Sequence, residues 1–241
     1  ARPKAYYWSF SSRPRASGDE MVRHYLPKLI AAAVAGLLLL AACAPGRPVA
    51  VPEDGVLRVS TPQTRLAVAI PEAQRDTARL LPDGTYMFGK EMGPTHTLLA
   101  TVSATVVEPS MWPAFQVRNA GATEAEMLED YLQEMEPLER ASPGRPSNSL
   151  LSFTKVGGAR AQLAAQGIAC NERALVALDH DVPGQGGRSF VYYASYYTCI
   201  DPTTHAPVEL GWSERLPDAP ERPQPRFAGE RDAFFDSLRF E

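Results

Sequence analysis

Residues 168–200 read IACNERALVALDHDVPGQGGRSFVYYASYYTCI. Two runs in this segment, 168–179 and 189–200, are rich in aliphatic, β-branched and aromatic residues, and the turn-forming sequence VPGQGG lies between them. β-branched and aromatic residues favour strands, whereas Pro and Gly favour the turn that connects two strands. The segment therefore predicts an antiparallel hairpin with its loop at 182–187, to which the remaining strands of a sheet can be added.

The predicted hairpin places two cysteines opposite each other. With the loop centred between residues 179 and 188, the numbers of facing residues should sum to about 367. Cys170 and Cys199 sum to 369, a shift of the centre by one residue, and in that register Val176 faces Tyr193. Facing Cα atoms in an antiparallel pair are about 4.5–5.5 Å apart, which suits a disulfide. The alternative is half of a zinc site, but the cysteines form no CxxC motif and no HxxxH motif accompanies them. We therefore expect a disulfide between Cys170 and Cys199.

The second strand of this hairpin is unusually aromatic. Tyr192 and Tyr196 fall on one face of a strand, and Tyr193 and Tyr197 fall on the other. An exposed row of tyrosines could stack on sugar rings or hold a peptide, so Tyr192 and Tyr196 form a candidate binding surface. The alternative, which we favour at this point, is a central strand that is covered on both faces.

The rest of the mature sequence adds strands and two helices. Strands are predicted at 57–59, 66–70, 85–90, 95–107, 115–118, 150–156, 159–165 and 208–212. The clearest helix is 123–136, where Thr123 and Glu126 have the spacing of a capping box and an apolar stripe lies opposite an acidic, solvated face. A Pro-rich loop follows at 137–149, and a C-terminal helix is predicted at 228–240. This order predicts an α+β fold, a mostly antiparallel sheet with helix 123–136 and the C-terminal helix packed on it.

The order of elements resembles the PsbP/Mog1-like α+β sandwich. The ending Phe235-Asp236-Ser237-Leu238-Arg239-Phe240 looks like the last-helix ending of that group. The resemblance covers the domain by topology and only these six residues by sequence. It implies the sandwich fold and, because that group holds assembly factors and binding modules more than enzymes, a binding function.

The N-terminal part of the sequence is typical of an exported lipoprotein. A basic segment opening at Met21 precedes an uncharged apolar run at 29–42, which is shorter than the roughly 20 residues that span a bilayer as a helix. The run ends in Leu40-Ala41-Ala42-Cys43, which resembles the lipobox of bacterial prolipoproteins, where the cysteine sulfur carries the lipid. The alternative is an ordinary secretory signal with a chance cysteine.

The lipobox divides the sequence into four parts. We expect residues 1–20 to be an upstream artefact outside the native protein, 21–42 to be the signal peptide, 43–55 to be a lipidated Pro-rich tether, and 56–241 to be a single α+β domain. By the same resemblance, Ala44 in place of Asp after the cysteine implies delivery to the outer membrane, with the domain facing the periplasm. Such an oxidising compartment also suits the expected disulfide.

Charge limits the choice of partner. The whole chain has a formal net charge of −4, and the part before Cys43 holds six basic but only two acidic residues, so the mature chain is more acidic still. An acidic chain without a Lys/Arg cluster argues against nucleic acid and against electrostatic binding to anionic headgroups. The expected partners are the membrane, reached through the lipid on Cys43, and an envelope protein or glycan.

Asp179-His180-Asp181 is the one tight cluster of chemically active residues in the mature sequence. It could ligate a divalent cation or orient an imidazole as a base, but polar residues are common where a strand enters a loop. The sequence has no HExxH motif, nucleophile elbow or phosphate-binding glycine loop, so we expect no cofactor. We therefore favour a non-enzymatic binding or assembly module, with an envelope hydrolase or metal-dependent enzyme using 179–181 as the alternative.

Overall fold

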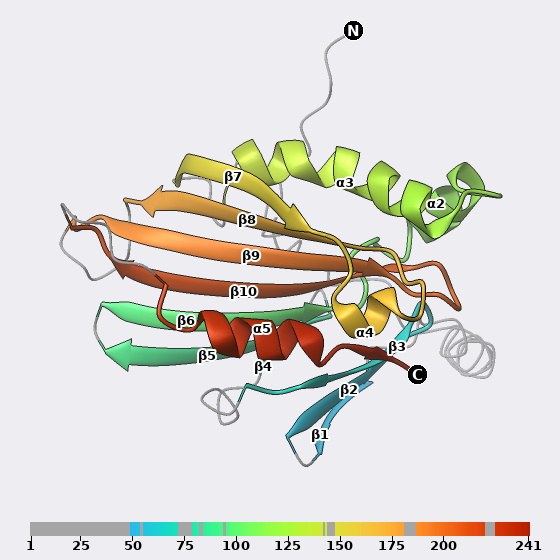
Figure 1. Ribbon diagram of the computed structural model, residues 1–241, viewed down its shortest axis with the longest axis horizontal. Coiled ribbons are helices and arrows are strands. Elements are labelled where there is room, and N and C mark those ends of the chain that lie inside the picture. Colours follow the sequence, from blue (N-terminus) through green and yellow to red (C-terminus); the bar gives the residue numbers. More distant parts are fainter. Residues whose placement is uncertain are drawn as a thin grey trace, which may run out of the picture. The chain divides into compact units, whose positions relative to one another are not determined.

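The structure is a computed structural model that describes residues 49–53, 55–71, 79–81, 84–93, 95–141, 143, 148–180, 187–219 and 225–241 (Figure 1). The predicted signal peptide, Cys43 and Asp181 lie outside the described residues. Within the described residues, no helix is both long and apolar enough to cross a membrane.

Two antiparallel sheets form the domain. The larger has seven strands in the order β4-β5-β6-β10-β9-β8-β7. Their bounds in that order are Arg79–Leu80, Thr85–Gly93, His96–Ser103, Pro207–Pro217, Phe190–Ile200, Cys170–Asp179 and Ser149–Gly157. The smaller sheet has the order β1-β2-β3-β11, with bounds Val49–Glu53, Val56–Ser60, Arg65–Ala69 and Arg239–Phe240. The predicted α+β class with a mostly antiparallel sheet is thus confirmed at this coarse level.

The main core lies on one face of the seven-stranded sheet. It combines the inward residues of that sheet with residues of β2 and β3 and with α5 (Ala228–Asp236). The ring of Phe235 stacks on Tyr197 of β9 at 5.4 Å, and that of Phe234 contacts Trp212 of β10 at 6.1 Å, so α5 lies across this face (Figure 1). Phe234 and Phe235 of the predicted C-terminal helix are therefore buried, because they close the core between the two sheets.

The opposite face of the same sheet packs against two other helices. The bounds of α2 are Trp112–Arg118 and those of α3 are Glu124–Ala141. Met127, Leu128, Tyr131 and Leu132 of α3 are buried in a second cluster that includes Phe115 of α2 and Ile200 at the end of β9. α3 contacts β7, β8 and β9, so it covers only part of this face.

The helix predicted at 123–136 is present and longer than predicted. Its capping box is confirmed, because the Thr123 amide donates to Glu126 Oε2 at 2.8 Å and the Glu126 amide donates to Thr123 Oγ1 at 3.3 Å. The helix continues past Pro137 to Ala141, where a loop was predicted. An ion pair from Arg140 to Glu136 (2.8 Å) supports this last turn and offsets part of the cost of proline.

The structure differs from several local predictions. The C-terminal helix predicted at 228–240 ends at Asp236, and Arg239–Phe240 forms the strand β11. Residues 115–118, predicted as a strand, belong to α2, where Pro113 suits the first helical turn. Part of 159–165, also predicted as a strand, is the short helix α4 (Ala161–Ala164). The predicted tether contains β1, which pairs with β2; Pro52 is compatible with a strand here because β1 is an edge strand.

The central hairpin has the predicted register. β8 pairs with β9 so that Val176 faces Tyr193, and Cys170 faces Cys199 with Cα atoms 4.1 Å apart and the two sulfurs joined as a disulfide. Both cysteines are buried in the main core. The disulfide therefore ties together the open end of the hairpin, as the position of the loop predicted.

The turn between β2 and β3 connects the small sheet to the large one. Thr64 Oγ1 donates a hydrogen bond to Asp201, a buried residue that follows β9, and Gln63 Nε2 donates to the carbonyl of Val107 at 3.2 Å. Both Thr64 and Gln63 are buried. The two sheets are thus joined by polar contacts at this turn as well as by the core.

Candidate functional site: the open face of the seven-stranded sheet

Tyr192 and Tyr196 lie on the face of the sheet that is opposite the main core. Both are half-buried, and they lie on either side of Ala194 on β9, which is buried. A hydrogen bond joins their side chains, and burial together with the neighbouring Tyr192 raises the pKa of Tyr196 well above its usual value. The two side chains therefore meet on the surface beside Ala194.

An aromatic patch surrounds this tyrosine pair. Leu150 and Phe153 of β7 join Tyr192 and Tyr196 as half-buried residues around the buried Leu175, Ala177 and Ala194. The register aligns Phe153 with Leu175 and Ala194, and Leu150 with Ala177 and Tyr192. The patch thus combines aromatic and aliphatic side chains, and Arg140 of α3 lies over the ring of Phe153 at 4.1 Å.

The surface continues from the aromatic patch onto β5 and β6. Six residues on this side of these strands are half-buried and uncharged: Thr85, Met87, Thr97, Leu99, Thr101 and Ser103. They alternate with Phe88, Leu98, Ala100 and Val102, which are buried in the main core. We call the surface formed by these six residues and the aromatic patch the open face, because among the described elements the main helix contacts on this side are those of α3 with β7, β8 and β9.

Gly211 permits close packing at the middle of the open face. On β10 it lies directly between Tyr196 of β9 and Thr101 of β6. A Cβ at this position would lie 2.3 Å from Thr101 Oγ1 and 3.6 Å from Tyr196 Cδ1. The side chains of both neighbours therefore occupy the space above the glycine, which makes the surface continuous from β9 to β6.

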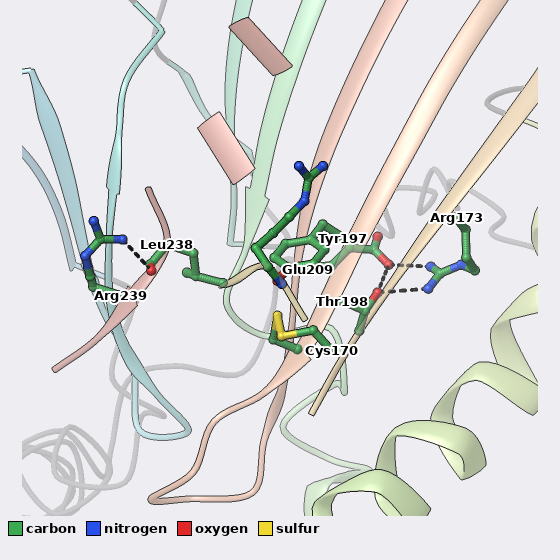
Figure 2. Close-up of a disulfide and its surroundings, with 9 residues drawn as sticks. Cys170, Arg173, Tyr197, Thr198, Glu209, Leu238 and Arg239 are labelled. Carbon is green, nitrogen blue, oxygen red and sulfur yellow. Dashed lines mark hydrogen bonds and ion pairs between the residues drawn. A yellow bond between two sulfur atoms is a disulfide. The ribbon is translucent and has the colours of Figure 1, made fainter. Parts of the chain in front are cut away.

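A buried charge network forms the border between the open face and α3 (Figure 2). Arg173 is fully buried; its guanidinium donates to both oxygens of Glu139 on α3 (2.6 and 3.0 Å), to Glu209 (2.9 Å) and to Thr198 (3.0 Å). Burial raises the pKa of Glu209, and the guanidinium of Arg173 opposes that rise. One cation thus holds two carboxylates, and the network fixes the C-terminal half of α3 on the sheet.

A second ion pair lies at the other end of the open face. Arg215 of β10 contacts Asp179 at 3.3 Å and lies over the ring of Phe190 at 5.7 Å. Asp179 is buried, which is why it keeps a cationic partner. The charges thus lie around the edge of the open face, whereas its centre carries rings, methyl groups and hydroxyls.

The predicted catalytic alternative is not assembled by the residues that the structure describes. His180 is exposed, and its Nδ1 lies 3.3 Å from the hydroxyl of Ser189. His96 lies three strands away, about 14 Å by the usual strand spacing, where its Nε2 is 2.8 Å from the buried Glu214. His205 is in the β9–β10 turn, in the left-handed region at φ 62°. Among the described residues, no three His, Cys, Asp or Glu side chains are grouped as a metal site.

The charge network was not predicted from the sequence. Arg173 and Glu209 lie inside predicted strands, where a charged residue is usually taken to face solvent. A usable signal was the position of Arg173, because it shares a strand face with Leu175 and Ala177. Its partners Glu139 and Glu209 are 34 and 36 residues away, too far for any local pattern to connect.

Comparison with known proteins gives no relative: no protein-family model matches the chain, and no curated sequence matches it.

Proposed function

We propose that this chain is a lipid-anchored lipoprotein of the bacterial cell envelope that binds a protein partner on the open face. The observation that carries the binding proposal is the contrast between the two faces of one sheet. On one face Phe88, Leu98 and Tyr197 are buried in the main core, whereas on the other Met87, Leu99 and Tyr196 are half-buried and uncharged.

The composition of the open face favours a protein as the partner. Protein interfaces place aromatic residues and Met at a centre that is depleted of charge, and place charged residues around it. Leu99, Met87 and the tyrosine pair supply such a centre, and the Arg215–Asp179 pair lies at the edge. The hydroxyls of Thr97 and Thr101 can exchange hydrogen bonds with polar groups of the partner without the cost of burying a charge.

The anchor follows from the sequence. The lipobox Leu40-Ala41-Ala42-Cys43 supports lipidation of Cys43, and Ala44 supports delivery to the outer membrane, with the domain in the periplasm. A lipid on a short tether would hold the domain near the membrane and leave the open face available. Cys43→Ser should release the domain from the membrane fraction or trap the uncleaved precursor; a processed Cys43→Ser protein that still sediments with membranes would refute the anchor.

Photo-crosslinking in intact cells tests the open face. A benzophenone amino acid at Leu99 or Met87 should capture a discrete protein, whereas the same probe at Val156 should not. Val156 is 55% exposed on the edge strand β7, so the probe there is at least as accessible. Leu99→Arg should abolish capture from Met87 while the melting temperature changes little. Equal capture from Val156, or adducts with glycan instead of protein, would contradict the proposal.

A further inference from the structure

One face of α2 is apolar and exposed. The helix buries Phe115, and the half-buried Trp112 stacks on that ring at 5.6 Å. Its opposite face carries Pro113, Ala114 and Val117, all exposed, and Val117 is 78% exposed. An isolated exposed apolar residue needs no explanation, but a whole helical face of such residues does.

The same end of the domain receives the chain from the predicted lipid. β1 begins at Val49, which pairs with Ser60. Ser60 is followed by the β2–β3 turn, in which Gln63 donates a hydrogen bond to the carbonyl of Val107. A second turn, closed by hydrogen bonds to the Glu108 carbonyl, then leads from Val107 into α2. Consecutive contacts thus connect the start of β1 to the start of α2.

The tether is too short to let this end move far from the membrane. Only residues 44–48 separate Cys43 from Val49. An extended chain spans about 3.3–3.6 Å per residue, so Val49 stays within about 20 Å of a lipidated Cys43. A lipid on Cys43 would therefore keep this end of the domain, to which α2 is connected, near the bilayer surface.

We infer that the exposed face of α2, formed by Pro113, Ala114 and Val117, inserts into the headgroup region of the membrane that carries the lipid anchor, with the exposed Met111 at the start of the helix. The inference rests on the proposed lipidation of Cys43. The proposed contact between α2 and the membrane is apolar, and Trp112 lies at its boundary, as in helices that lie in a membrane interface. Arg118 is already paired with Asp130 and Glu134, both at 2.7 Å, so attraction to anionic headgroups contributes little and added salt leaves the contact intact.

Such a contact would orient the domain as well as hold it. A lipid on a tether allows rotation about the attachment point, whereas a second contact at α2 fixes which end of the sheet faces the membrane. Bilayer contact thus gives α2 a role separate from partner binding on the sheet.

An environment-sensitive probe tests the inference. The lipidated protein is labelled with a nitrobenzoxadiazole dye at Val117→Cys and reconstituted into vesicles of phosphatidylethanolamine and phosphatidylglycerol. Leu138→Cys is the matched control, because Leu138 is 62% exposed on α3, some 20 Å along that helix from its start. We expect a blue shift and a several-fold rise in emission at position 117, unchanged by salt, and none at position 138.

Flotation of the same vesicles separates the two proposals. A protein that floats but gives the same emission at 117 and 138 keeps its anchor and refutes membrane contact by α2. A protein that carries no lipid on Cys43 and does not float refutes the anchor and, with it, the role of α2. A response at 117 that salt abolishes would show electrostatic adsorption and would also overturn the inference.

Discussion

Arg173→Ala should be one of the most destabilising single substitutions in the domain. The guanidinium is fully buried and donates to Glu139, Glu209 and Thr198. Removing one partner of a buried ion pair costs about 3–5 kcal/mol, because the remaining charge is left buried and unpaired. In a domain of this size 1 kcal/mol corresponds to about 2–4 °C, so the melting temperature should fall by about 6–20 °C.

The pH dependence of this loss identifies its cause. Burial raises the pKa of Glu209 in the folded state, so the folded protein binds more protons there than the unfolded chain. The stability that Glu209 contributes is present below its pKa in the unfolded chain, about 4.3, and is lost as the pH rises through its raised pKa in the folded state. Arg173→Ala removes the cation that opposes the rise, so the deficit relative to the parent should be largest at neutral pH and should shrink as the pH is lowered toward 4.5.

Urea unfolding followed by circular dichroism measures both effects. Arg140→Ala is the matched control, because Arg140 is exposed, pairs with Glu136 on the same helix and covers Phe153 at 4.1 Å. Arg140→Ala should lower the free energy of unfolding by about 1 kcal/mol, and this loss should be nearly independent of pH. A loss below about 1 kcal/mol for Arg173→Ala, or one that is equal at pH 7 and pH 4.5, would refute the argument that α3 is held by buried charge.

Three further predictions concern single sites. Replacing Cys170 and Cys199 together by Ser should lower the free energy of unfolding by about 3–4 kcal/mol, less if the hairpin persists in the unfolded chain, and calorimetry with and without reductant checks this. Gly211→Ala should cost about 1–3 kcal/mol because the new methyl group meets Thr101, and Thr101→Ala should restore part of that loss in thermal melts of the double variant. His180→Ala should change stability by less than about 0.5 kcal/mol and leave the envelope phenotype intact; a null phenotype at normal protein level would instead favour a catalytic or metal site.

The central hairpin was predictable because two independent signals agree. The loop position fixes which residues face each other, and the two cysteines fall on that register and share an apolar face. The segment 115–118 was mistaken for a strand because Phe115 and Val117 alternate with polar residues, a pattern that a short helix also produces. In a strand Phe115 and Val117 would lie on the same face. In the structure Phe115 is buried while Val117 is exposed, as expected for a helix.

The candidate site was predictable only in part. Period-2 alternation correctly placed Tyr192 and Tyr196 on one face of β9. The alternation could not show which parts of this face the described helices cover, because coverage depends on where α3 and α5 pack, and both are amphipathic helices that could pack on either side. The Arg173 network could not be predicted for the same reason, since contacts between residues more than 30 positions apart depend on the topology of the fold.

The mass of the protein extracted from the envelope tests the central claim, that this is a lipid-anchored domain. Extraction in detergent without reductant, followed by intact-protein and peptide mass spectrometry, reports the first residue and any modification on it. The account predicts a mature chain that begins at Cys43 and carries the mass of a diacylglycerol thioether on that residue. A chain that begins elsewhere, or that begins at Cys43 without lipid, would contradict it.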